Sequence, residues 1–177
     1  MPHSLLADYP QRSDRFDEML APDGSVRPAW RRFVAHLEAS NSADRRHWLD
    51  YARQRILENG VTYNVYADPK GADRPWELDP LPLILSAHEW QSLAAGVAQR
   101  ARLLNAVLND VYGAQQLLAD GTLPPALVFG HTNFLWPCHG IRCPGDIHLH
   151  LYAADLARSP DGRWWVIADR TQAPSGA

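Results

Sequence analysis

The chain has 177 residues, of which 46% are hydrophobic and 21% are charged, and its formal net charge is -3. That length allows one domain with a real core, and the charge gives no electrostatic footprint for nucleic acid. No stretch approaches the roughly 20 apolar residues of a membrane span. We therefore expect a single domain over residues 1–177, with neither nucleic acid nor a membrane as a partner.

The cellular compartment is predicted from two absences in the sequence. The N-terminus "MPHSLLADYPQRSDRFDEML" lacks the basic start and apolar core of a signal peptide. Cys138 and Cys143 are too few for a disulfide framework. We expect a cytoplasmic protein.

The first 60 residues predict a helical region. The segment "RPAWRRFVAHLEA" places its large apolar residues at helical spacing. A second helix is expected from about Ser42 to Asn59, with Gly60 as its stop signal. Its inward residues are expected to be Trp48, Tyr51, Ala52 and Ile56.

Residues 61–177 predict an α/β arrangement. Strands are expected at 61–67 and, as a buried strand, at 81–85. A long helix follows, opened by a capping box of Ser86 and Glu89 and ending near Gly113. A short helix at 114–120 and a Pro- and Gly-rich loop region come next. The predicted class is α/β, with the helical N-terminal region packed on a small mixed sheet that ends in an antiparallel hairpin.

That hairpin carries the candidate metal ligands. "IHLHLYAADLA" and "RWWVIADR" flank the turn signal "RSPDG". With the turn centred near Asp161, Asp155 and Asp169 should lie opposite each other, and Thr171 should share a face with Asp169. Two facing carboxylates repel each other unless a cation lies between them, and oxygen ligands suit Mg²⁺. The alternative is that both aspartates are solvated residues at strand ends.

The run "YAADLARSPDGRWWVIADRTQAPSG" resembles the metal-binding hairpin of ATP-grasp ligases. That hairpin has an acid on one strand, an Asp-Gly turn, then acid-x-Asn and a Pro-Gly loop. The resemblance implies that Asp155 and Asp169 are the two acids and that Thr171 replaces the asparagine. Aspartate for the more usual glutamate is a second departure from that pattern.

The resemblance covers nearly the whole chain, through segments such as "NGVTYNVYADPKG", "RPWELDPLPLIL" and "LPPALVFGHTNFL". These look like the N-terminal part of circularly permuted ATP-grasp proteins related to glutathionylspermidine synthetase. The resemblance implies a ligase that joins a carboxylate to an amine with Mg²⁺ and ATP. It also implies that the half holding the nucleotide follows residue 177 or is a partner subunit, so that this part, which has the single lysine Lys70, is inactive alone. The implied contacts are Arg142 and Arg74 to the acyl-phosphate, and Arg170, Ser175 and Gly176 to the cofactor.

Other possibilities stay open at the sequence level. The chain could be a binding or scaffolding module without ATP chemistry, and an uncovered sheet edge could let it self-associate. Cys138, His139 and Cys143 are competent zinc ligands, or they are ordinary loop residues. Arg100 either faces a substrate anion or lies on a solvated helix face.

Overall fold

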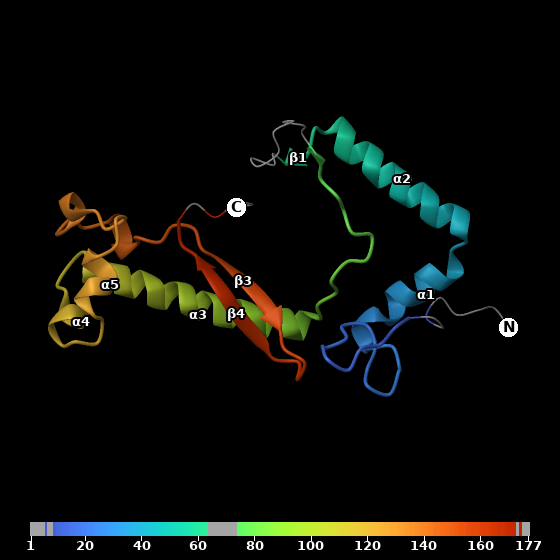
Figure 1. The fold of residues 1–177 in the computed structure, drawn as a ribbon, viewed down its shortest axis with the longest axis horizontal. Helices are drawn as coiled ribbons and strands as arrows, with labels where there is room; N and C mark the ends of the chain where they lie inside the picture. The colour runs from blue at the N-terminus through green and yellow to red at the C-terminus, as the bar shows by residue number, and fades with distance from the viewer. Residues whose placement is uncertain (1–5, 7–8, 64–73, 173, 175–177) are drawn as a thin grey trace. The chain divides into compact units, whose positions relative to one another are not determined.

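The computed structural model describes residues 6, 9–63, 74–172 and 174, without the side chains of residues 62, 63, 74 and 75. The chain divides into two compact units, Met1–Ser86 and Ala87–Ala177, and each is described by itself (Figure 1). The predicted α/β class is confirmed, with helices first and a two-stranded antiparallel hairpin at the C-terminus.

The first unit is built on two helices. A 3-10 turn, η1 (Pro28–Trp30), leads into α1 (Arg31–Ala39), and α2 (Ser42–Glu58) follows after a short break. Trp30 and Val34 are buried together with Leu20, each 6% exposed. They form the small core of this unit because the helical spacing brings both to one side of the η1–α1 segment.

Both ends of α2 are capped. The Asn41 side chain accepts hydrogen bonds from the backbone N–H groups of Ala43 and Asp44, and the Asp44 carboxylate accepts one from the Asn41 N–H. This capping box supplies hydrogen-bond acceptors to N–H groups of the first turn, which have no partner within the helix. At the other end Gly60 has a φ of 62°, the left-handed conformation that glycine adopts at no steric cost.

The predicted inward face of α2 is wrong in part. Tyr51 is 58% exposed and Trp48 41%, while Ala52 and Ile56 are half-buried. No described residue of α2 is fully buried. Among the described residues α1 and the segment 76–81 line its apolar side, and the helix keeps much of that surface accessible.

The first unit has one small sheet among its described residues. β1 (Thr62–Tyr63) pairs antiparallel with β2 (Arg74–Pro75). The rest of the strand predicted at 61–67, and Lys70, lie outside the described residues. The strand predicted at 81–85 is wrong, because that segment forms no strand. Pro82 within it, like Pro80 just before it, lacks the N–H group that a ladder needs.

The second unit is organised by α3 (Ala87–Val111), which confirms the predicted long helix (Figure 1). Its apolar residues recur at helical spacing from Trp90, which is 60% exposed, to Val111, which is 5% exposed. The predicted short helix is α4 (Gln116–Ala119). The expected loop region instead holds α5 (Pro125–Phe129) and the 3-10 turns η2 (Trp136–Cys138) and η3 (Pro144–Asp146).

The C-terminal hairpin lies alongside α3 (Figure 1). It consists of β3 (Ala153–Arg158) and β4 (Trp164–Arg170). The Gly162 N–H donates to the Ser159 carbonyl, 2.8 Å apart, and Gly162 has a φ of 86°. The turn signal therefore predicted this connection correctly.

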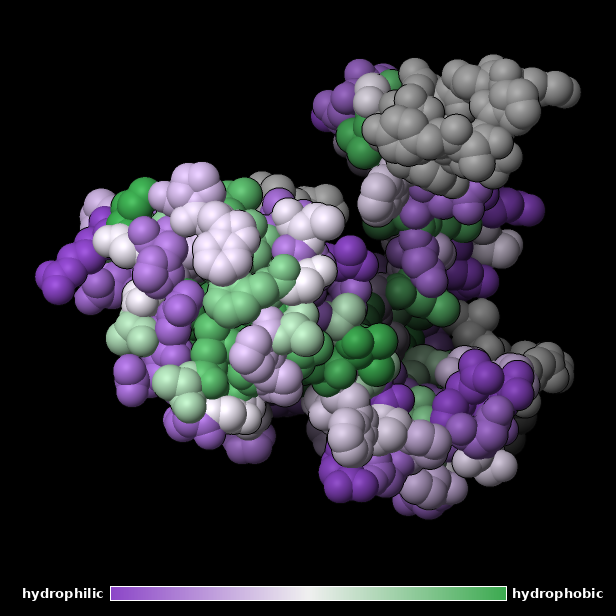
Figure 2. Space-filling model, turned by 60° about the vertical axis from the view of Figure 1, so that its left-hand side comes forward, coloured by the Kyte–Doolittle hydropathy of each residue, from purple (hydrophilic) through white to green (hydrophobic). Residues whose placement is uncertain are grey.

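Many large apolar side chains lie at the surface. Trp76, Trp136 and Ile167 are 54%, 61% and 66% exposed, and Figure 2 shows apolar (green) residues scattered among polar (purple) ones. Within the described residues, no helix combines the length and the apolar character needed to cross a bilayer.

Candidate functional site

The strand register places the two candidate carboxylates on opposite faces of the hairpin. Asp169 pairs with Ala154, and Asp155 pairs with Ala168. A register shift between Asp155 and Leu156 adds one residue to β4. The expectation that Asp155 and Asp169 face each other is therefore wrong. Neighbouring strand residues point to opposite faces, and the bulge moved the pairing by one position.

Asp169 lies on the face turned towards α3, where it meets a guanidinium and a phenol. Arg100 donates from Nε to Oδ1 at 2.6 Å and from Nη2 to Oδ2 at 2.7 Å. The Tyr152 hydroxyl donates to Oδ1 at 2.5 Å. Because Arg100 and then Tyr152 stabilise the carboxylate, the pKa of Asp169 falls to about 2. Burial and the bond to Asp169 raise the pKa of Tyr152. Arg100 is thus an ion-pair partner rather than a solvated helix residue.

Asp155 lies on the face turned away from α3 and has an arginine partner of its own. Arg170 donates from Nη2 to Oδ2 at 2.7 Å, and its Nε lies 3.2 and 3.1 Å from the two carboxylate oxygens. The hydrogen bond from Arg170 lowers the pKa of Asp155, and the same bond raises the pKa of Arg170. The side chains are 45% and 58% exposed. This pair is therefore accessible from solvent.

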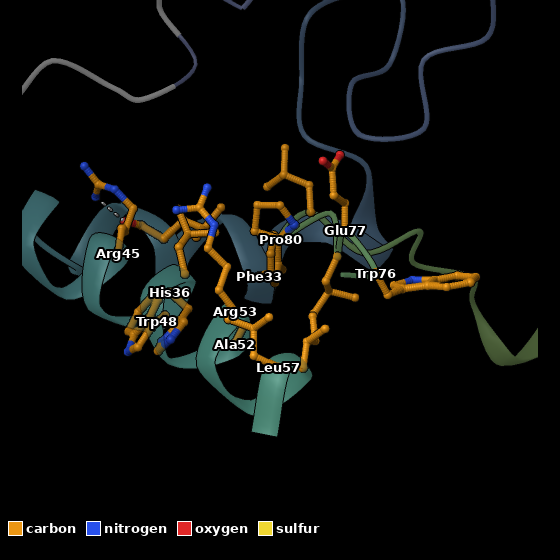
Figure 3. A pocket seen from close by; sticks show the side chains of 15 residues that line it. Phe33, His36, Arg45, Trp48, Ala52, Arg53, Leu57, Trp76, Glu77 and Pro80 are labelled. Carbon is orange, nitrogen blue, oxygen red and sulfur yellow. Dashed lines mark hydrogen bonds between the residues drawn. The ribbon is translucent and has the colours of Figure 1, made fainter. Parts of the chain in front are cut away.

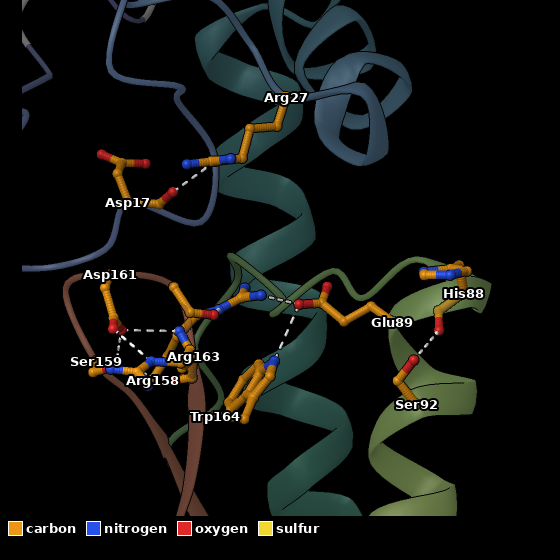
Figure 4. A network of polar contacts seen from close by, with 11 residues as sticks. Asp17, Arg27, His88, Glu89, Ser92, Arg158, Ser159, Asp161, Arg163 and Trp164 are labelled. Atoms are coloured by element: carbon orange, nitrogen blue, oxygen red, sulfur yellow. Dashed lines mark hydrogen bonds and ion pairs between the residues drawn. The ribbon is translucent and has the colours of Figure 1, made fainter.

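A second ion pair fixes the turn end of the hairpin to the start of α3. Glu89 accepts a hydrogen bond from Arg158 Nη2 and one at 3.1 Å from Trp164 Nε1 (Figure 4). These carboxylate and guanidinium side chains are only 23% and 15% exposed. Arg100 lies eleven positions after Glu89 on the helix, which corresponds to a rise of about 16 Å. Asp169 lies five positions after Trp164 on β4, and a strand of that length spans about the same distance. Because the two distances match, β4 can contact α3 at both points, through Trp164 to Glu89 and through Asp169 to Arg100.

The structure does not bring the three candidate Mg²⁺ ligands together. Magnesium needs near-octahedral oxygen ligands, of which the protein commonly supplies one or two carboxylates. Asp155 and Asp169 point to opposite faces and each is bound to a guanidinium. Thr171 lies just past the end of β4 and is exposed. Among the described residues, no three His, Cys, Asp or Glu side chains converge as a metal site would require.

Comparison with known proteins identifies the family. A model described as circularly permuted ATP-grasp type 2 matches residues 82–177, more than half of the chain. The chain belongs to this family. The match starts just before α3 and includes the hairpin, so the elements of the second unit lie within the matched segment.

Relatives of this ATP-grasp chain occur in several bacteria. The uncharacterized protein Rv2567 of Mycobacterium tuberculosis is 39% identical over 92% of this chain and 19% of its own length. The uncharacterized protein sll0335 of Synechocystis sp. is 34% identical over 91% of this chain and 34% of its own. For ML0605 of Mycobacterium leprae the identity is 32%, over 91% of this chain and 28% of that protein. The chain thus spans about a fifth to a third of the length of these relatives.

The other predicted contact residues are spread over the ATP-grasp chain. Arg74 lies in β2 of the first unit, and its side chain is outside the described part of the structure. Arg142 is exposed in the loop between η2 and η3 of the second unit. Arg170 ends β4, whereas Ser175 and Gly176 lie outside the described residues. Of Arg142 and Arg170, the two whose side chains the structure describes, only Arg170 is bound to a hairpin carboxylate.

In the loop that contains Cys138 and Cys143, one thiol lies against an imidazole ring. Cys143 Sγ lies 3.5 Å from His148 Nδ1, and the His148 ring stacks on Tyr112 with centroids 5.8 Å apart. The possible zinc site of Cys138, His139 and Cys143 is not formed among the described residues. The strand expected around His148 is also wrong, because β3 begins only at Ala153.

Asn105 explains why the chain before β3 is ordered without a strand partner. Its Nδ2 donates to the Asp146 carbonyl at 2.9 Å, and its Oδ1 accepts from the N–H groups of His148 and Leu149 at 2.8 and 3.0 Å. Asn109, one turn along, also donates to the Asp146 carbonyl, at 2.6 Å. The helix-face asparagines at i and i+4 were the only sequence signal for this clamp.

A separate groove lies in the first unit (Figure 3). It has a volume of about 910 Å³ and lies between α1, α2 and the segment 76–81, a size within the range of small-molecule sites. The His36 and Trp48 rings stack on each other there, with centroids 5.3 Å apart. The charged residues at its lining are Arg45, Arg53 and Glu77. Its lining is otherwise mainly apolar, which suits an apolar or aromatic occupant.

The pKa of Asp169 predicts how the second unit responds to acid. A carboxyl whose folded pKa is about 2, against an ordinary value of 3.8, stabilises the fold above about pH 4, and this contribution is lost as the pH falls towards 2. We expect the stability difference between wild type and Asp169→Asn to be largest near neutral pH and to close between pH 4 and 2. Urea unfolding followed by circular dichroism across that range measures it. Asp155→Asn, at the more exposed pair, should show a smaller difference, and equal differences would contradict this assignment.

Proposed function

We propose that this chain is part of an ATP-dependent carboxylate–amine ligase, to which it contributes the hairpin of the nucleotide site. The observation that carries the proposal is the fixed seating of the hairpin on α3, through Glu89 at one end and Arg100 at the other, in a segment matched by an ATP-grasp family model. A rigid hairpin suits phosphoryl transfer, because positioning and electrostatics supply most of the catalysis. We also propose that the protein is related to glutathionylspermidine synthetase and that it is located in the cytoplasm.

The reaction class follows from the family resemblance. ATP would transfer its γ-phosphoryl group to a substrate carboxylate, and the amine would then attack the acyl-phosphate and release phosphate. In such enzymes Mg²⁺ neutralises charge on the phosphates. In this chain Arg142 and Arg74 are proposed to steady the acyl-phosphate, and Arg170, Ser175 and Gly176 to contact the nucleotide. The small-molecule carboxylate and amine are the proposed substrates.

The 177 residues alone are expected to show no ligase or ATPase activity. The chain covers 19–34% of the relatives' lengths, and its single lysine, Lys70, leaves it without the set of lysines that ATP-grasp enzymes place on phosphate. A site that lacks half of its catalytic groups is expected to retain far less than half of the rate, because the groups act together. ADP release measured with a coupled assay checks this. Turnover by the chain alone that disappears in Arg170→Ala would contradict it.

The ligase proposal itself is tested by supplying the rest of the protein. The chain is mixed with the remaining part of the Synechocystis relative, and hydroxylamine is added to trap acyl-phosphates from a panel of carboxylates. ATP-dependent hydroxamate that requires both components supports the proposal. ATP binding by the mixture without any turnover would favour a non-catalytic module instead.

The groove of the first unit supports that second candidate function. Its wide apolar lining and the exposed Trp48 and Trp76 suit a binding or scaffolding module. The open edges of the two-stranded hairpin could also pair with a second copy. Sedimentation at several protein concentrations measures self-association, and a strict monomer at all of them would count against edge pairing.

A further inference from the structure

The pair of Asp155 and Arg170 stands where the sequence predicts a metal. The two residues share the hairpin face turned away from α3, because Asp155 pairs with Ala168 and Ala153 pairs with Arg170. The neighbours of the pair on that face are thus alanines, which leave the guanidinium uncovered. Arg170 is 58% exposed, so its remaining N–H groups are accessible to a ligand.

We infer that Arg170, and not Mg²⁺, supplies the positive charge on this face of the hairpin, and that the face binds an oxyanion directly on the guanidinium. The inference rests on the proposed function for its biological setting, since an ATP-grasp site must hold phosphate or carboxylate oxygens. It replaces the carboxylate–metal–phosphate arrangement with a carboxylate–arginine–phosphate one.

The geometry excludes the metal at this position. A divalent cation needs oxygen lone pairs, and both oxygens of Asp155 accept hydrogen bonds from Arg170 at 3.2 Å or less. The second carboxylate, Asp169, is on the other face and is held by Arg100 and Tyr152. A shared site would require both arginines to leave and the bulge to be reset.

The guanidinium retains donors for a ligand after binding Asp155. Arginine has five N–H groups in a planar fork, and Asp155 engages Nε and Nη2. The edge that carries Nη1 is therefore not used by this carboxylate. A planar edge with parallel N–H groups matches the oxygens of a phosphate or a carboxylate. Asp155 holds the fork in one orientation, so less rotamer entropy is lost when an anion binds.

The test uses the 177-residue chain with tripolyphosphate as the phosphate probe and citrate as the carboxylate probe. Isothermal titration is performed at low ionic strength, without added metal and then, for tripolyphosphate, with Mg²⁺. We expect binding without Mg²⁺ by at least one probe, weakened about 10-fold or more in Arg170→Ala. Which probe binds identifies the oxyanion.

The controls separate this site from general charge. Arg163 is also an exposed arginine of the hairpin paired with an aspartate, Asp161, at 2.6 Å, so Arg163→Ala should leave binding within about 2-fold of wild type. Arg170→Lys keeps the charge and loses the fork, and is expected to bind more weakly than wild type. Asp155→Asn gives the sharpest contrast: an arginine site keeps or strengthens anion binding, whereas a metal site loses it.

The outcomes that overturn the inference are equally specific. They are no binding of either probe, equal loss in Arg163→Ala and Arg170→Ala, or binding that needs Mg²⁺ and is abolished by Asp155→Asn. Circular dichroism of each variant establishes that it is folded. None of these results decides the ligase proposal, because the hydroxamate assay on the reconstituted protein measures that separately.

Discussion

Glu89→Ala is expected to lower the stability of the second unit by about 2–3 kcal/mol. The carboxylate accepts hydrogen bonds from Arg158 and Trp164, and the ion pair is less than a quarter exposed on either side. Its removal takes the Glu89 carboxylate away from the Arg158 guanidinium, which also lies over the Trp164 ring at 4.6 Å. Breaking a mostly buried pair from one side costs far more than breaking a surface pair.

Hydrogen exchange distinguishes this loss from a general weakening. A loss of about 2 kcal/mol corresponds to roughly 30-fold faster exchange of the β3–β4 amides. The matched control is Glu58→Ala, which breaks the exposed Arg55–Glu58 pair on α2 and should cost no more than about 0.5 kcal/mol. If both variants lost the same amount of stability, the contacts of Glu89 with Arg158 and Trp164 would not be what fixes the hairpin. A double-mutant cycle with Arg158→Ala measures the coupling directly.

The helices and the hairpin were predicted correctly from the sequence where a single local signal determines the end of a helix or the position of a turn. Gly60, Gly121 and Gly162 all adopt positive φ where helices or the turn were expected to end. The signals at Ser86, Glu89 and Gly113 and the turn signal before Gly162 likewise predicted the long helix and the hairpin. Each of these is a preference of a few neighbouring residues, independent of the rest of the fold.

The candidate site was harder, because its geometry depends on a single residue. The predicted pairing of Asp155 with Asp169 counted residues evenly from the turn, but the shift after Asp155 displaces the register by one and changes the face. Nothing in the local sequence marks such a bulge. The partner of Asp169 is Arg100, 69 residues away, and a contact of that separation is set by how helix and hairpin pack.

Predictions from the apolar pattern failed where the described part of the chain supplies no element to cover the apolar residues. The segment 81–85 reads as a buried strand, yet Leu81 and Leu83 are 52% and 57% exposed and no strand forms. Trp48 and Tyr51 on α2 show the same mismatch. Hydrophobic periodicity identifies which side would be buried, whereas burial itself requires a partner surface.

Asn105→Ala is expected to cost about 2 kcal/mol, because two backbone N–H groups lose their acceptor and one carbonyl loses one of its two donors. The affected groups are the His148 and Leu149 N–H groups, both partly buried, and the Asp146 carbonyl, which keeps its bond from Asn109. The amide protons of His148 and Leu149 should exchange faster, while the exchange rates of the α4 amides should be unchanged. Asn109→Ala removes no partner of an N–H group in this loop and should cost about half as much or less.

The Asn105 clamp also reaches the candidate site through the chain. The segment that it holds ends three residues before Tyr152, whose hydroxyl binds Asp169. Loosening the loop should therefore weaken the Tyr152–Asp169 bond, and we expect the pKa of Asp169 in Asn105→Ala to rise towards its ordinary value, measured by carboxyl NMR titration. Asn109→Ala should leave that pKa near the wild-type value. An unchanged titration in Asn105→Ala, with faster exchange at His148 and Leu149, would mean that Arg100 alone positions the carboxylate.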